Sequence, residues 1–137
     1  MEEKETLTII NKVDELPVLA GKIEELAEKW EFPIDLTMNL NLVLEEAVSN
    51  VIFYAFPDKE EHEINIMICR NDHSLVIEIH DEGVPFDPTL KQKPDLTLPA
   101  EDRPIGGLGI FLISKIMDKV SYKRINNENV LTLTKNI

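Results

Sequence analysis

The chain has 137 residues, a length that suits one domain with a substantial hydrophobic core. Its 43% hydrophobic and 29% charged residues are ordinary for a globular protein and exclude collagen-like, disulfide-rich and wholly disordered chains. The net charge of −12 disfavours nucleic acids and anionic membranes as partners, because both are bound by neutralising phosphates. We therefore expect no direct nucleic-acid partner and no membrane partner, whereas a basic protein surface would be attracted.

The start of the chain, MEEKETL, does not have the pattern of a signal peptide. No apolar run approaches the roughly 20 residues that a membrane-spanning helix needs. The single cysteine, Cys69, excludes an internal disulfide. We therefore expect one domain over residues 1–137, located in the cytoplasm.

Hydrophobic periodicity and turn signals predict the secondary-structure elements. In chain order they are a strand at 7–13, helices at 17–32 and 36–56, strands at 62–70 and 74–82, a proline-rich loop at 83–105, a helix after the glycines at 106–109, and a terminal hairpin that turns at 126–129. Strands and helices mix without strict alternation. This order predicts an α+β fold, with helices packed on one face of a mainly antiparallel sheet.

The second predicted helix carries a polar ridge beside its apolar face. At about 100° per residue, seven side chains share the face expected in the core: Leu40, Val43, Leu44, Ala47, Val48, Val51 and Ala55. Glu46, Asn50 and Tyr54 follow one another along its flank, while Glu45 and Ser49 lie further toward water. The Asn50 amide oxygen could coordinate Mg²⁺, and the Glu46 carboxylate could accept a proton from a nucleophile. The alternative is a surface glutamate beside a partly buried asparagine that only forms hydrogen bonds.

The strand at 74–82 ends in Asp81, followed by Glu82 and Gly83. A carboxylate at a strand end is held by a rigid element and could accept a hydrogen bond from an exocyclic amine of a purine. Gly83 would let a backbone or a base approach closely. The alternative is a polar turn without a ligand.

Three glycines, Gly106, Gly107 and Gly109, precede an apolar helix. Backbone N–H groups at such a position can converge on an anion, helped by the helix dipole. The Walker pattern is absent and no βαβ unit surrounds the glycines, which argues against P-loop and Rossmann sites. The alternative is a hinge or a tight helix start. Taken in chain order, the second helix would supply a metal ligand, the end of the strand at 74–82 a group that recognises the base, the proline-rich loop a lid, and the glycines a phosphate-binding turn.

Three strings carry a resemblance to a known family: EEAVSN at 45–50, DEGVPFD at 81–87 and GGLGIFLISKIMDKVSY at 106–122. On these motifs the chain resembles the GHKL (histidine-kinase-like) ATPase superfamily, and within it the anti-sigma-factor serine kinases of the switch-protein type. The resemblance implies a two-layer α/β sandwich, the Bergerat fold, with ATP and Mg²⁺ beneath a lid at about 84–105. Many family members have histidine where this chain has Tyr54, and many have glycine where it has Val84.

By motif position, the resemblance implies a role for each matched residue. Glu46 would be the general base, Asn50 the Mg²⁺ ligand, and Asp81 the partner of the adenine amino group with Gly83 beside it. The phosphate cradle would be formed by four residues: Gly106, Gly107, Leu108 and Gly109. Arg103 would lie in the lid, either near the nucleotide or as a solvated charge.

The activity that the resemblance implies is transfer of the ATP γ-phosphate to a serine of an anti-anti-sigma (STAS-type) protein. Family members also sequester a sigma factor and often form homodimers. One alternative is a nucleotide-gated partner switch without phosphate transfer. A scaffold that binds no nucleotide is the third hypothesis.

Overall fold

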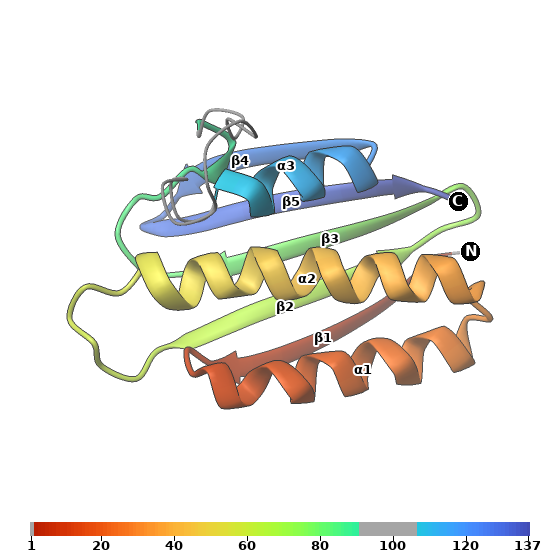
Figure 1. Cartoon of the computed structure of the whole chain (residues 1–137), viewed down its shortest axis with the longest axis horizontal. Coiled ribbons are helices and arrows are strands. Elements are labelled where there is room, and N and C mark those ends of the chain that lie inside the picture. Colours follow the sequence, from red (N-terminus) through yellow and green to blue (C-terminus); the bar gives the residue numbers. More distant parts are fainter. Residues whose placement is uncertain (1, 91–106) are drawn as a thin grey trace.

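The computed structural model describes residues 2–90 and 107–137. It is a two-layer molecule in which three helices cover one face of a sheet (Figure 1). The helices are α1 (Leu16–Lys29), α2 (Ile34–Tyr54) and α3 (Gly107–Ile116). The strands are β1 (Glu3–Ile10), β2 (Glu63–Arg70), β3 (Ser74–Asp81), β4 (Lys119–Ile125) and β5 (Glu128–Asn136), and two short 3₁₀ turns occupy Val13–Glu15 and Pro88–Leu90.

The five strands of the described chain form one sheet in the order β1-β2-β3-β5-β4. Each neighbouring pair in this sheet is antiparallel. The β4–β5 hairpin turns at Asn126 and Asn127, which have positive φ angles of 53° and 65°, as a two-residue turn of type I′ requires. The predicted α+β fold is confirmed. The hairpin turn is tighter than predicted, because Asn129 already belongs to β5.

The core lies between the helices and the covered face of the sheet. All seven residues predicted for the apolar face of the second helix are buried. They pack with isoleucines of β2 and β3 and with the inner sides of α1 and α3. Among the described helices, none is both long enough and apolar enough to cross a bilayer.

The first strand differs from its prediction at 7–13. β1 begins at Glu3 and ends at Ile10, and it pairs with β2 along its whole length. The Glu3 carboxylate accepts a hydrogen bond from Trp30 Nε1 and lies 3.2 Å from the Arg70 guanidinium, which also stacks over the Trp30 ring. These contacts hold the acidic start of the chain in the sheet, although its residues have low intrinsic strand propensity.

Candidate functional site

The polar ridge on α2 is partly buried, as its position beside the apolar face predicts. Glu46 is half-buried and Asn50 is only 6% exposed, whereas Glu45 is exposed and Ser49 is half-buried. The amide nitrogen of Asn50 is buried and has no hydrogen-bond partner among the described residues. An unpaired buried polar group costs about 1–3 kcal/mol. Because folded proteins rarely keep such a group without a reason, Asn50 fits a residue that binds a ligand.

Asp81 ends β3 as a buried residue that is only 3% exposed. Its Oδ1 accepts two hydrogen bonds at 2.9 Å, one from the Gly83 backbone N–H and one from Asn129 Nδ2. Among the described residues, no hydrogen bond to Oδ2 is found. Burial raises the pKa of the Asp81 carboxyl, and the bonds from Asn129 and Gly83 oppose this rise. The site therefore presents one fixed carboxylate whose second oxygen is available to a donor on a ligand.

Gly83 allows the loop after β3 to pack against the end of α2. A Cβ atom at this position would lie 2.3 Å from the carbonyl oxygen of Ala55 and 2.6 Å from its Cβ. The next residue, Val84, donates its backbone N–H to the same carbonyl over 2.8 Å. The close backbone approach predicted at Gly83 is therefore an approach to the protein's own helix end, which places Asp81 beside α2.

The first residues after Gly83 are tied to the fold. Phe86 stacks on Tyr54 with ring centroids 5.7 Å apart, and its backbone N–H donates to Asn129 Oδ1 over 3.2 Å. Val84 accepts a hydrogen bond from Asn129 Nδ2 over 2.8 Å. The beginning of the segment expected as a lid is thus linked to the helix that carries Glu46 and Asn50.

Asn129 is a site residue that the sequence analysis missed. It is 4% exposed, and both its amide N–H groups and its carbonyl oxygen are used in hydrogen bonds. The Tyr122 hydroxyl also donates to its Oδ1. Arg124 was missed as well, and it donates to the Gly83 carbonyl over 2.7 Å. The sequence offered one signal for Asn129, a polar residue shortly after Asn126-Asn127. That signal was interpreted as part of the hairpin turn.

The phosphate cradle is only partly described. Arg103 and Gly106 lie outside the described residues, whereas Gly107, Leu108 and Gly109 form the first turn of α3. Figure 1 shows that α3 begins, and β3 and α2 end, on the same side of the molecule. The helix N-terminus, with its unpaired backbone N–H groups and positive dipole end, therefore lies on the side of Asp81.

Within residues 2–90 and 107–137, no group of three or more His, Cys, Asp or Glu side chains is arranged to hold a metal ion. Asn50 offers an amide that could coordinate a hard cation through oxygen. The orphaned Asn50 amide nitrogen is a donor that suits a phosphate oxygen, while its amide oxygen remains for Mg²⁺. With the one-sided hydrogen bonding of Asp81 and the helix start at Gly107, these groups fit a nucleotide with an associated Mg²⁺.

Comparison with known proteins defines the class. Residues 10–135 match the family described as histidine kinase-like ATPase domain, and the chain belongs to this family. It is 30% identical over 112 residues to the serine/threonine-protein kinase BtrW of Bordetella bronchiseptica, which covers 82% of this chain and 79% of that relative. It is 31% identical over 124 residues to the serine-protein kinase RsbW of Listeria monocytogenes, covering 88% and 79%. For RsbW of Bacillus cereus the identity is 29% over 133 residues, covering 94% and 82%. The family predicted from the three motifs is confirmed.

Proposed function

We propose that the protein is an ATP- and Mg²⁺-dependent serine kinase that phosphorylates an anti-anti-sigma protein of the STAS type and sequesters a sigma factor. The observation that carries the proposal is the buried amide of Asn50, whose nitrogen has no partner among the described residues, one helical turn from the half-buried Glu46. Membership of the histidine kinase-like ATPase family and the similarity to proteins named serine-protein kinases support it.

In this proposal each residue acts on a defined atom. Asp81 accepts a hydrogen bond from the adenine amino group, and the N-terminus of α3 with Gly106 and Arg103 binds phosphates. Asn50 would hold Mg²⁺ through its amide oxygen. When bound, the ion would neutralise charge on the phosphates.

Glu46 acts on the acceptor. As the serine oxygen bonds to the γ-phosphorus, the bond to the ADP oxygen breaks, and the hydroxyl proton passes to the Glu46 carboxylate. Phosphoryl transfer needs positioning and charge neutralisation more than covalent help from the protein. General-base assistance of this kind contributes about 10²–10⁴-fold.

The test is transfer of labelled γ-phosphate to a purified anti-anti-sigma protein. Glu46→Gln should lower the transfer rate by about 10²-fold or more while ATP binding persists. The control is the neighbouring variant Glu45→Gln. Because Glu45 is exposed, this substitution should leave the transfer rate unchanged. Transfer by Glu46→Gln at the unmodified rate would contradict the base assignment.

A nucleotide-gated switch without transfer is the second candidate. It predicts that the unmodified chain binds its protein partners differently with and without ATP, yet forms no phosphoprotein.

A homodimer is also part of the proposal, since β1 forms one edge of the described sheet and an edge strand offers unpaired backbone groups. A molecular mass measured by light scattering would test it, and a monomer at micromolar concentration would oppose it.

A further inference from the structure

At the end of α2 remote from Asn50, α1 and α2 leave an apolar groove open to solvent (Figure 1). The groove lies between the end of α1 and the start of α2 and has a volume of about 790 Å³. Its apolar lining consists of Ala27, Phe32, Ile34 and Met38. Ile34 is 81% exposed and Met38 is 68% exposed, and they lie one helical turn apart on α2. Leu42, another turn along, is also exposed, so three large apolar side chains form one row.

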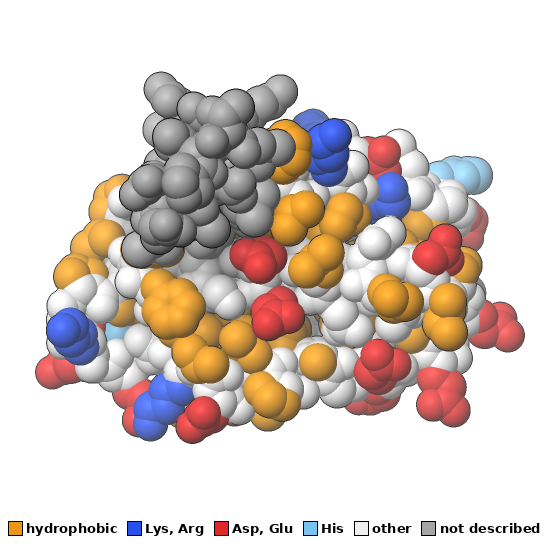
Figure 2. Space-filling model, viewed as in Figure 1, with side chains coloured by type: hydrophobic (Ala, Val, Ile, Leu, Met, Phe, Trp, Pro, Cys, Tyr) orange, Lys and Arg blue, Asp and Glu red, His pale blue; other side chains and the backbone are white. Residues whose placement is uncertain are grey.

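The rim of this groove is acidic. Glu24, Glu25 and Glu28 line it from α1, and all three are exposed. Figure 2 shows acidic side chains around the apolar ones over the end of α1 and the start of α2. The three carboxylates line the α1 side of the groove and leave its apolar side chains accessible.

The lysines of α1 neutralise this rim only in part. Lys22 and Lys29 both lie 3.4 Å from the Glu5 carboxylate of β1, so their charges are directed toward the sheet. Lys22 also lies 3.8 Å from Glu25, whereas Glu28 has no ion pair within the described part of the chain. Because the whole chain carries a net charge of −12, no distant excess of positive charge compensates the groove.

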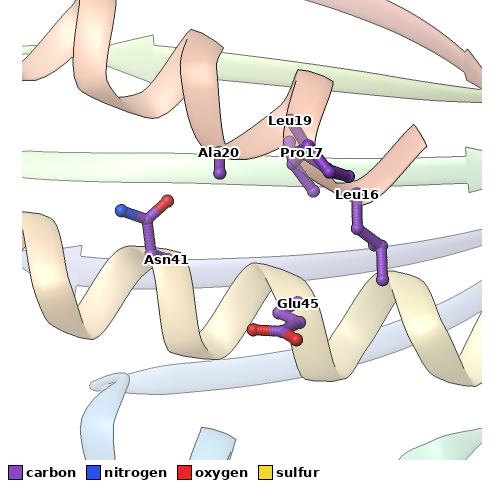
Figure 3. Close-up of a pocket in the computed structure, with 6 residues that line it drawn as sticks. All are labelled: Leu16, Pro17, Leu19, Ala20, Asn41 and Glu45. Carbon is purple, nitrogen blue, oxygen red and sulfur yellow. The ribbon is translucent and has the colours of Figure 1, made fainter. Parts of the chain in front are cut away.

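A second hollow continues the seam between the helices. It has a volume of about 240 Å³ and is lined by Leu16, Pro17 and Ala20 of the α1 side and by Asn41 and Glu45 of α2. Figure 3 shows Ala20 and Asn41 facing each other across the seam. The Asn41 amide donates to Glu24 over 3.2 Å and so links the two helices along the seam. The seam follows α1, whose 14 residues span roughly 21 Å, enough for several turns of a docked helix.

We propose that the α1–α2 groove binds an amphipathic, basic helix of a partner protein. Apolar side chains of that helix would insert between Ile34 and Met38, and its flanking lysines or arginines would pair with Glu24, Glu25 and Glu28. An apolar helix face laid into a groove is a common mode of peptide recognition, and the acidic rim selects the charge of the occupant. A second copy of this chain fits poorly, since its matching groove would bring like charges together.

The proposal goes beyond the proposed function and does not require the nucleotide. Its test uses two fluorescent 18-residue peptides with the same leucine spacing, one with flanking lysines and one with flanking glutamates. Fluorescence anisotropy with the full chain should show binding of the lysine peptide and at least tenfold weaker binding of the glutamate peptide. Equal binding of both, or no binding of the lysine peptide, would overturn the proposal.

Matched variants locate the binding. Met38→Gln and Glu28→Gln should each weaken binding of the lysine peptide about fivefold or more, with unchanged melting temperatures because both residues are exposed. Ile125→Gln and Glu63→Gln, exposed residues elsewhere, should leave it within twofold. Equal loss in all four variants would refute the groove. Asn50→Ala should bind the peptide normally, so failure of the nucleotide site and failure of the groove are distinguishable.

Discussion

Asn129 Nδ2 donates a hydrogen bond to Asp81 Oδ1 over 2.9 Å and joins two residues that are 48 positions apart in the chain. The bond runs between directly paired positions of β5 and β3. It occupies the oxygen of Asp81 that also accepts the Gly83 N–H. The remaining carboxylate oxygen is therefore held in one orientation, which is what recognition of an amino group on a base requires.

Asn129→Ala should lower the free energy of unfolding by about 2–4 kcal/mol, because several buried and part-buried groups lose their hydrogen bonds together. Those groups include the Val84 carbonyl and the Phe86 N–H. Urea denaturation followed by circular dichroism measures the change. Asn136→Ala, at the exposed end of the same strand, should stay within about 0.5 kcal/mol. Similar losses in the two variants would contradict the central position of Asn129.

Asp81→Asn should keep the fold and lose the nucleotide. An asparagine oxygen can still accept the bonds from Gly83 and Asn129, while its NH₂ group replaces the free oxygen and opposes the adenine amino group. Isothermal titration with ATP should show affinity reduced by about 10²-fold, in line with an unpaired donor at a recognition site. Unchanged ATP affinity would remove Asp81 from the site.

The same variant gives a pH test. Because the pKa of Asp81 is raised in the folded chain, the folded state holds this proton more tightly than the unfolded state. The unmodified chain should thus lose stability relative to Asp81→Asn as the pH rises from about 4, the ordinary value for an aspartate, through the raised pKa, and the difference should then level off. Urea unfolding from pH 4 to 8 measures it. If the stability of the unmodified chain relative to Asp81→Asn stays constant from pH 4 to 8, the pKa of Asp81 is not raised in the folded chain.

Gly83→Ala should destabilise the fold by roughly 2–3 kcal/mol, because the added methyl would meet the Ala55 backbone. Gly21 provides the matched control: a Cβ there meets nothing within 4 Å, and it lies inside α1. Gly21→Ala should therefore raise stability by about 0.5–1 kcal/mol through helix propensity. Thermal melts should therefore show a lower melting temperature for Gly83→Ala and a higher one for Gly21→Ala. A change in the same direction for both variants would contradict this explanation.

The sequence predicted those features that depend on local pattern. Residue spacing within one element, or between two elements adjacent in the sequence, predicts the core face of α2 and the β2–β3 hairpin. The same local pattern places Asp81 and Gly83 at the end of β3. Asn129 and Arg124 could not be predicted this way, because their roles arise from antiparallel pairing of β5 with β3 and β4. The early start of β1 was missed for a similar reason, since Glu3 is held by Arg70 and Trp30 from distant segments.

The most direct test of the central claim is a thermal-shift titration with Mg-ATP on the unmodified chain and on Asn50→Ala. Without ligand the variant should melt no lower than the unmodified chain, because the Asn50 amide nitrogen has no hydrogen-bond partner among the described residues for alanine to lose. At about 100 times the dissociation constant, ATP should stabilise the unmodified chain by about 2.7 kcal/mol, and the variant should lose most of this magnesium-dependent stabilisation. If Mg-ATP leaves the melting temperature of the unmodified chain unchanged, the residues brought together around Asn50 and Asp81 do not form a nucleotide site.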